Sequence, residues 1–108
     1  MTTRGRVAVG IVQKPWGWEE ILMETPNYRV KKLFVIIGHR TSEQYHKEKD
    51  ETWIFPDGRV QHIAPGTVHR LGNNGPHPIL EVLEVAHGDD SDIVRLQDDY
   101  GRSKPEGA

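Results

Sequence analysis

The sequence predicts an all-β fold, a small barrel or sandwich that forms a single domain. Short β-branched and apolar runs recur along the 108 residues and are separated by turns rich in glycine and proline. This pattern is typical of sandwiches and barrels. A chain of this length holds one domain with one modest core, and residues 1–108 contain no repeat and no linker-like composition.

Three strands are expected in the first part of the chain. Residues 7–12 are β-branched and apolar, residues 18–24 follow the break at Pro15-Trp16-Gly17, and residues 28–37 follow a Pro26-Asn27 turn. The last of these runs is continuously apolar from residue 33 to residue 37. That pattern predicts a strand buried on both faces.

Shorter elements are expected in the rest of the chain. Candidate strands cover residues 42–47, 51–55, 59–63, 68–71 and, after a glycine- and proline-rich loop, 79–86. Glu81 and Glu84 fall on opposite faces of the last strand, so at most one of them can face an interior cavity. Residues 93–98 predict one helical turn capped by Ser91 or Asp92, and residues 103–108 predict a frayed tail.

Composition excludes several classes of function. The formal net charge is −2, from 14 basic and 16 acidic residues, so we expect no nucleic-acid partner. The chain has no cysteine, which excludes disulfides and a thiolate metal site. No apolar run approaches the ~20 residues of a membrane span, and residues 1–6 lack the apolar core of a signal peptide. We therefore expect no membrane association and a cytoplasmic location.

Potential metal ligands are concentrated in two short segments. Gln44, His46 and Glu48 alternate along an expected strand, so their side chains share one face. Glu51 follows three residues later, and His69 lies just beyond a proline-glycine turn. Two imidazoles and carboxylates from neighbouring strands are typical ligands of a divalent first-row metal. The spacing alone fits equally an edge strand with a solvated polar face.

The frame around these residues distinguishes the two interpretations. From Gly38 to Gly58 the chain reads G-(x7)-H-x-E-(x2)-E-(x6)-G, and from Gly58 to Asn73 it reads G-(x5)-A-P-G-(x2)-H-(x3)-N. These segments resemble the two signature motifs of the cupin superfamily, in which three histidines and one glutamate hold a metal inside a small barrel. The resemblance implies a double-sheet jelly roll. Glu48 stands where a cupin usually has its second histidine.

A more specific resemblance covers residues 14–102. The segments at residues 14–20, 28–32, 42–46, 69–71, 80–85 and 92–102 are similar to the C-terminal cupin domain of type II mannose-6-phosphate isomerases, a family often fused to mannose-1-phosphate guanylyltransferase. The tail is the most specific of these segments. Relative to this family, one hairpin after Glu51 is expected to be missing, since Gly58 serves both motifs. The cavity is then more open, or it is closed by a partner subunit.

The resemblance implies a ligand set and candidate substrate contacts. His46, Glu51 and His69, completed by Glu48 or Gln44, are the expected ligands of one divalent metal (Zn, Mn or Fe). If Glu48 is not a ligand, it is the expected proton shuttle.

The expected contacts with a phosphorylated sugar are Arg70, Lys14, Lys32 and Arg102. Arg70 follows His69 directly, so strand alternation points it away from the metal, but the resemblance places an arginine there. A guanidinium presents a fork of donors that suits phosphate.

Three functions remain open from the sequence. The leading hypothesis is a metal-dependent aldose–ketose isomerase of the mannose-6-phosphate type. The second is another metal-dependent cupin enzyme, such as a dioxygenase or an epimerase. The third is a non-catalytic sugar- or metal-binding module, which the expected missing hairpin and the lack of a nucleotidyltransferase domain favour. In each case we expect a homodimer in which the strand at residues 7–12 pairs with a neighbouring subunit and covers an exposed edge.

Overall fold

The computed structural model describes residues 10–88 and 90–102, and these residues form an all-β fold. The strands are β1 (Gly10–Lys14), β2 (Gly17–Glu24), β3 (Arg29–Ile36), β4 (Glu43–His46), β5 (Asp50–Ile54), β6 (Val60–Ile63), β7 (Ile79–His87) and β8 (Ile93–Gln97). One short 3₁₀ helix, η1 (Asp90–Asp92), precedes β8. Within the described ranges, no helix has the length and hydropathy needed to cross a membrane.

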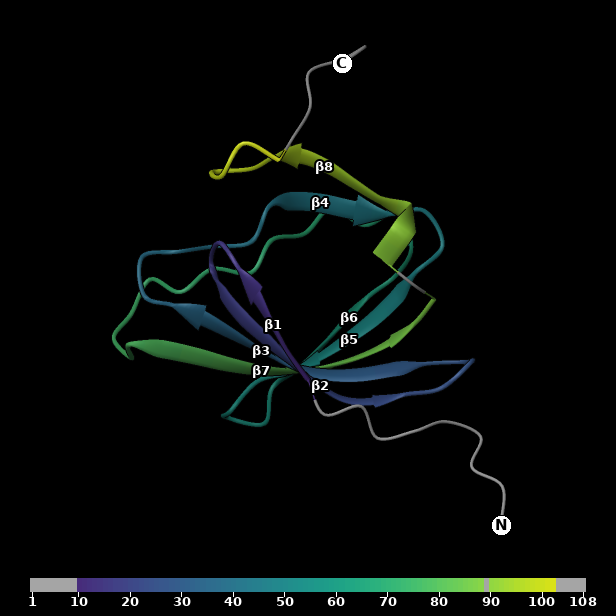
Figure 1. Ribbon diagram of the computed structural model, residues 1–108, viewed down its shortest axis with the longest axis horizontal. Coiled ribbons are helices and arrows are strands. Elements are labelled where there is room, and N and C mark those ends of the chain that lie inside the picture. The colour runs from purple at the N-terminus through teal and green to yellow at the C-terminus, as the bar shows by residue number, and fades with distance from the viewer. Residues whose placement is uncertain (1–9, 89, 103–108) are drawn as a thin grey trace.

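The strands form two facing layers. Six strands make an antiparallel sheet in the order β1-β2-β3-β7-β5-β6, and β4 pairs with β8 in a second sheet. Figure 1 shows the β4–β8 pair as a separate layer above the large sheet. The chain passes from β3 in one sheet to β4 in the other, and β7 returns between β3 and β5. This double-sheet arrangement confirms the predicted jelly roll.

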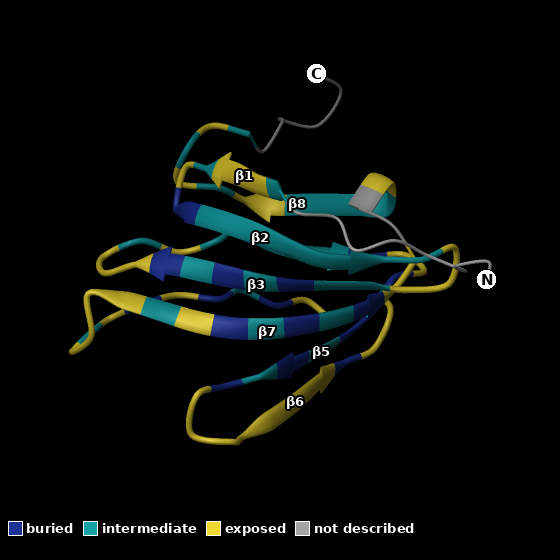
Figure 2. Ribbon diagram, turned by 60° about the horizontal axis from the view of Figure 1, so that its bottom comes forward, coloured by how far each residue is buried: buried dark blue, intermediate teal, exposed yellow. Residues whose placement is uncertain are grey.

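The apolar core lies on the inner face of the large sheet. Its buried members are Trp16, Leu33, Val35, Trp53, Phe55, Ile63, Leu71 and Val82. Figure 2 shows that buried residues are concentrated on β3, β7 and β5, the central strands of this sheet. The side chains of Val35 and Val82 are fully buried, so the core is densest where these strands run side by side.

Strand β3 is buried on one face only, and the prediction of two buried faces was wrong. Leu33 and Val35 are buried, whereas Ile36 is 38% exposed. Phe34 lies on the outer face and stacks on Trp18, with ring centroids 4.8 Å apart. An apolar run predicts two covered faces only if a second layer packs outside the sheet. Both described layers leave that outer face uncovered.

The expected helical turn at residues 93–98 was also wrong, because this segment is strand β8. It pairs antiparallel with β4, with Ile93 opposite His46 and Arg95 opposite Gln44. Five residues are too few to stabilise an isolated helix, whereas pairing with β4 satisfies the backbone hydrogen bonds. The only helical turn described near this position is η1, which ends at Asp92.

Strands β5 and β6 form a tight hairpin around Gly58. The Phe55 N–H donates to the Arg59 carbonyl at 2.9 Å, and Gly58 adopts a φ of 88° that favours glycine. The expectation that this chain lacks a hairpin found after Glu51 in the resembled isomerase family stays a prediction. Residues 10–12 of the expected N-terminal strand belong to β1, which pairs with β2 of the same chain as an edge strand. Residues 7–9 and the predicted tail at 103–108 lie outside the described ranges.

Candidate metal centre

Three segments bring His46, Glu51 and His69 together in the interior of the fold. His46 ends β4, Glu51 lies in β5, and His69 follows the turn at Gly66. The Gly66 N–H donates to the His46 carbonyl at 2.7 Å, and His69 exchanges two backbone hydrogen bonds with Gln44, at 2.8 and 3.0 Å. The segment that carries His69 is thereby held beside β4.

The ligand atoms of these three residues converge on one point. Glu51 Oε2 lies 3.0 Å from His46 Nε2 and 3.3 Å from His69 Nε2, and all three ligand atoms lie within 4.8 Å of one another. The residues are 2%, 2% and 8% exposed, in the order His46, Glu51, His69. Despite these short distances, none of the three atoms has a partner with hydrogen-bond geometry among the described residues.

Unsatisfied buried polar atoms are rare in folded proteins and call for an explanation. Here two imidazole nitrogens and one carboxylate oxygen face the same small space. Nitrogen and oxygen donors of this kind suit a divalent first-row metal. The three residues therefore fit a metal ion, and their arrangement is a possible metal site.

The remaining polar atoms of the ligands are held by neighbours. His69 Nδ1 donates to the Thr67 carbonyl at 2.8 Å, and the indole N–H of Trp53 donates to Glu51 Oε1 at 3.2 Å. His46 Nδ1 lies 3.2 Å from Asp92 Oδ1. Such partners orient metal ligands, and here they leave the three convergent atoms facing one another.

The two buried glutamates differ in their protonation. Burial alone raises the pKa of Glu51, but its contacts with His46 and His69 outweigh burial and bring the pKa below its ordinary value. Burial, and then the adjacent Glu51 carboxylate, raise the pKa of Glu84. Glu51 is therefore the ionised member of the pair, as a metal ligand must be.

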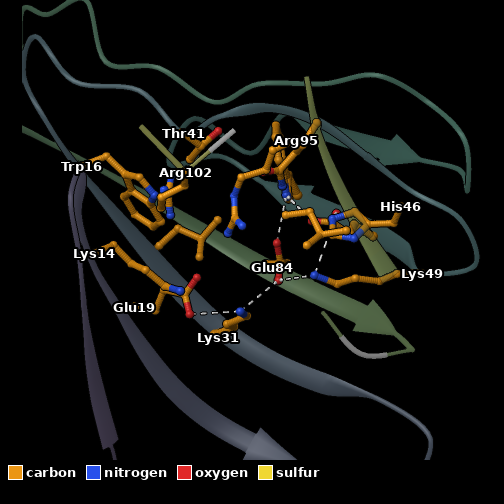
Figure 3. A pocket seen from close by; sticks show the side chains of 15 residues that line it. Lys14, Trp16, Glu19, Lys31, Thr41, His46, Lys49, Glu84, Arg95 and Arg102 are labelled. Carbon is orange, nitrogen blue, oxygen red and sulfur yellow. Dashed lines mark hydrogen bonds and ion pairs between the residues drawn. The ribbon is translucent and has the colours of Figure 1, made fainter. Parts of the chain in front are cut away.

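A network of buried charges extends from the ligands. Lys31 Nζ lies 3.0 Å from Glu19 Oε1, and Lys49 Nζ lies 3.7 Å from Glu84 Oε2. Lys49 is also 3.9 Å from Glu51, and Lys31 is 3.9 Å from Glu84. Figure 3 shows these side chains from Glu19 to Lys49 along one wall of a pocket. His46 and Glu51 line the same pocket.

Comparisons with known proteins agree with this geometry. No protein-family model matches the chain. A mannose-1-phosphate guanylyltransferase of Klebsiella pneumoniae is 32% identical over 110 aligned positions, which cover 84% of this chain and 23% of that protein. Alginate biosynthesis protein AlgA of Pseudomonas aeruginosa is 34% identical over 85% of this chain and 23% of its own length. The chain thus spans about a quarter of the length of these curated relatives.

Solved structures give the fold. A Klebsiella pneumoniae protein with a double-stranded β-helix domain superposes with a TM-score of 0.57 at 18% identity, over 74% of this chain and 79% of that one. KdgF from Halomonas sp. gives a TM-score of 0.52 at 13% identity, over 77% and 89% of the two chains. The double-stranded β-helix is the barrel of cupins.

This chain has the fold of a small cupin. The relatives also confirm its predicted resemblance to the mannose-1-phosphate guanylyltransferase/mannose-6-phosphate isomerase family.

The expected fourth ligands lie in different environments in this structure. Gln44 is half-buried and lines the pocket, where its side-chain oxygen accepts a hydrogen bond from the Ser42 hydroxyl. Glu48 is exposed and lies outside the group of three ligands. Strand alternation placed Glu48 beside His46, but β4 ends at His46, so the alternation does not continue to Glu48.

The expected phosphate contacts also separate. Lys14 and Arg102 line the pocket. Arg70 lies outside it and donates to the backbone carbonyls of Thr41 and Gln97 at 2.9 and 3.3 Å. Lys32 lies 3.7 Å from Glu81, whose side chain is 52% exposed. The structure therefore does not bring Arg70 or Lys32 to the metal ligands.

Several charged residues of the pocket were missed from the sequence. Lys31, Lys49, Glu19 and Arg95 all line it. Lys31 occupies an inward position of β3. Its spacing of two residues from the apolar Leu33 could have indicated this from the sequence. Arg95 was missed because its segment was assigned to a helical turn. The expectation that only one of Glu81 and Glu84 faces the interior is confirmed, since Glu84 is 3% exposed and lines the pocket.

Proposed function

We propose that this cupin is a metal-dependent isomerase that interconverts the aldose and ketose forms of a phosphorylated sugar. The observation that carries the proposal is the convergence of His46, Glu51 and His69 beside a pocket rich in cationic side chains. The resemblance to proteins named for mannose-1-phosphate chemistry supports the substrate class. Because the chain spans only a quarter of those relatives, their own activity is not carried over with the resemblance.

The charge of the pocket favours an anionic substrate. Five cationic side chains line it (Lys14, Lys31, Lys49, Arg95 and Arg102), against three carboxylates (Glu19, Glu51 and Glu84). Glutamates neighbour Lys31 and Lys49 at the deep end. Lys14 makes no ion pair with any described residue, so its ammonium group is available to a phosphate.

The reaction moves a proton between adjacent carbons of the sugar. When bound, a divalent metal supplies polarisation of a substrate oxygen. In this proposal His46, Glu51 and His69 would hold that metal, and Lys14 would orient the phosphate. Arg102 lines the same pocket, but its guanidinium donates to both carboxylate oxygens of Asp98, each at 2.9 Å. Glu48 is exposed, so we propose that the proton is moved by an ionisable side chain that lines the pocket instead.

A coupled assay for fructose-6-phosphate formation from mannose-6-phosphate tests the activity, with Zn, Mn, Fe and Co supplied separately. We expect turnover with at least one metal and none after His46→Ala. Lys14→Ala should weaken sugar-phosphate binding about tenfold, because a charge-assisted contact is lost, and should leave metal content unchanged. Lys32→Ala is the matched control. A wild-type protein that binds a sugar phosphate but gives no turnover with any of the four metals would be a non-catalytic module.

One observation favours a second candidate. Two histidines and one carboxylate are also the ligand set of non-haem iron oxygenases, so a cupin dioxygenase fits the same three residues. Elemental analysis of protein purified without added metal discriminates between the candidates. Iron alone, with oxygen consumption in the presence of an organic substrate, would favour the oxygenase.

Assembly and location are also proposals. We propose a homodimer in which the edge strand β1 pairs with a second copy, since Ile11 on this strand is 62% exposed. Sedimentation at micromolar concentration tests this assembly, and a monomer would contradict it. The cytoplasmic location expected from the sequence is kept as part of the proposal.

A further inference from the structure

Asp92 lies next to the metal centre without being one of the three convergent ligands. It ends η1, immediately before β8, where Ile93 is paired with His46. Its Oδ1 atom lies 3.2 Å from His46 Nδ1, on the opposite side of the ring from Nε2. We propose that Asp92 is a positioning residue, which holds His46 in the tautomer that carries its proton on Nδ1 and presents the Nε2 lone pair to the metal. This inference rests on the metal site of the proposed function.

The Asp92 carboxylate is itself fixed in place. Its Oδ2 atom accepts the backbone N–H groups of Glu48 and Lys49, at 2.6 and 2.9 Å. Its side chain is only 18% exposed. An ionised carboxylate accepts hydrogen bonds and donates none, so a hydrogen bond from His46 requires the proton on Nδ1. Asp92 therefore sets both the orientation and the tautomer of His46.

The proton of His69 is also held on Nδ1, but by a different kind of partner. Its Nδ1 atom donates to the Thr67 carbonyl at 2.8 Å, and a carbonyl oxygen can only accept. The support of His69 is local backbone, two residues away. The support of His46 comes from a side chain 46 residues along the chain. Metal affinity should therefore depend on how the η1–β8 segment sits against β4.

Asp92 could instead only stabilise the turn after β4, because it accepts hydrogen bonds from two backbone N–H groups there. The two roles make different predictions for the His46 ring. A residue that only stabilises the turn leaves the tautomer of His46 unchanged when the carboxylate becomes an amide. A positioning residue does not, because an amide oxygen holds the imidazole N–H more weakly and its NH₂ group can donate to the opposite tautomer.

The test compares the full chain with its Asp92→Asn variant. Zn²⁺ affinity is measured by competition with a chelator, and long-range ¹H–¹⁵N NMR of the Zn²⁺-loaded protein reports which nitrogen of His46 carries the proton. Asp99→Asn is the matched control, because Asp99 also anchors the C-terminal segment, through Arg40 at 2.7 Å, but contacts no ligand. We expect Asp92→Asn to lower Zn²⁺ affinity by about 10- to 100-fold and to mix the tautomers, with neither change in Asp99→Asn.

The outcomes separate this inference from the proposed function. If the wild type binds Zn²⁺ and Asp92→Asn binds it equally well, the positioning role is overturned and the metal site stands. If the wild type binds none of Zn²⁺, Mn²⁺, Fe²⁺ and Co²⁺, both fall. The NMR measurement on the wild type needs no variant to fold: in the Zn²⁺-loaded protein, a His46 ring that binds the ion through Nδ1 and carries its proton on Nε2 would overturn the role of Asp92 by itself.

Discussion

The interior of this cupin has an apolar half and a charged half, and the same strands build both. Along β3 the inward positions change from Lys31 to Leu33 and Val35, and along β7 they change from Glu84 to Val82. The two halves are equally buried, since Lys31 and Glu84 are each 3% exposed and Leu33 is 4% exposed. Burial alone therefore does not separate the residues that stabilise the fold from those that serve a site.

The halves differ in how their atoms are satisfied. The apolar half needs only close packing. In the charged half Lys31 and Lys49 lie near glutamates, while the inward atoms of His46, Glu51 and His69 have no hydrogen-bond partner among the described residues. Burying charges opposes folding unless they are well paired. We infer that the charged half is retained for binding, and that each half can be disrupted without the other.

The largest effect should follow a change in the apolar half. Ile63 is 2% exposed, belongs to the apolar core and does not line the pocket. Ile63→Ala should lower the free energy of unfolding of the metal-free protein by about 2–5 kcal/mol, because it removes buried methyl groups and leaves a cavity. Urea denaturation measures this loss.

Zn²⁺ affinity of the folded Ile63→Ala protein should match that of the wild type. The milder Ile63→Val is the control and should lose about 0.5–1.5 kcal/mol. Zn²⁺ binding that weakens in step with stability in both variants would show that the two halves are not separable.

A smaller effect on binding should distinguish two glutamates three residues apart. Glu51→Gln removes the ionised oxygen shared by both imidazoles, so Zn²⁺ affinity should fall at least as far as the ~100-fold that loss of an outer partner can cause, or about 2.7 kcal/mol. Glu48→Gln is the matched control and should leave the affinity unchanged, because Glu48 is exposed. Isothermal titration with Zn²⁺ measures both, and equal losses would return Glu48 to the ligand set.

The fold and the convergence of the three residues could be predicted from the sequence. Motif spacing and strand periodicity are local, and they were enough to place His46, Glu51 and His69 on one interior face. The features that local pattern did not reveal depended on distant contacts. The environment of Glu48 depended on where β4 ends, and there the Glu48 N–H donates a hydrogen bond to Asp92, 44 residues away. The strand at residues 93–97 depended on pairing with β4, which no local propensity reveals.

Arg70 and Lys31 show the same limit for the substrate contacts. The sequence placed Arg70 beside a ligand, but its guanidinium is held by the carbonyls of Thr41 and Gln97. Lys31 faces the interior although it has the composition of a surface residue, because its register on β3 places it opposite Glu84. The face of the sheet on which a charged side chain of β3 lies could be assigned only once the register between β3 and β7 was known.

Anomalous diffraction from crystals of the wild type grown with Zn²⁺ would locate the ion itself. We expect one strong peak about 2.0–2.2 Å from His46 Nε2, His69 Nε2 and Glu51 Oε2, with Glu48 and Arg70 outside ligand distance. A peak on other residues, or fully loaded crystals with no peak between the two imidazoles, would contradict the assignment of these three residues as the metal centre.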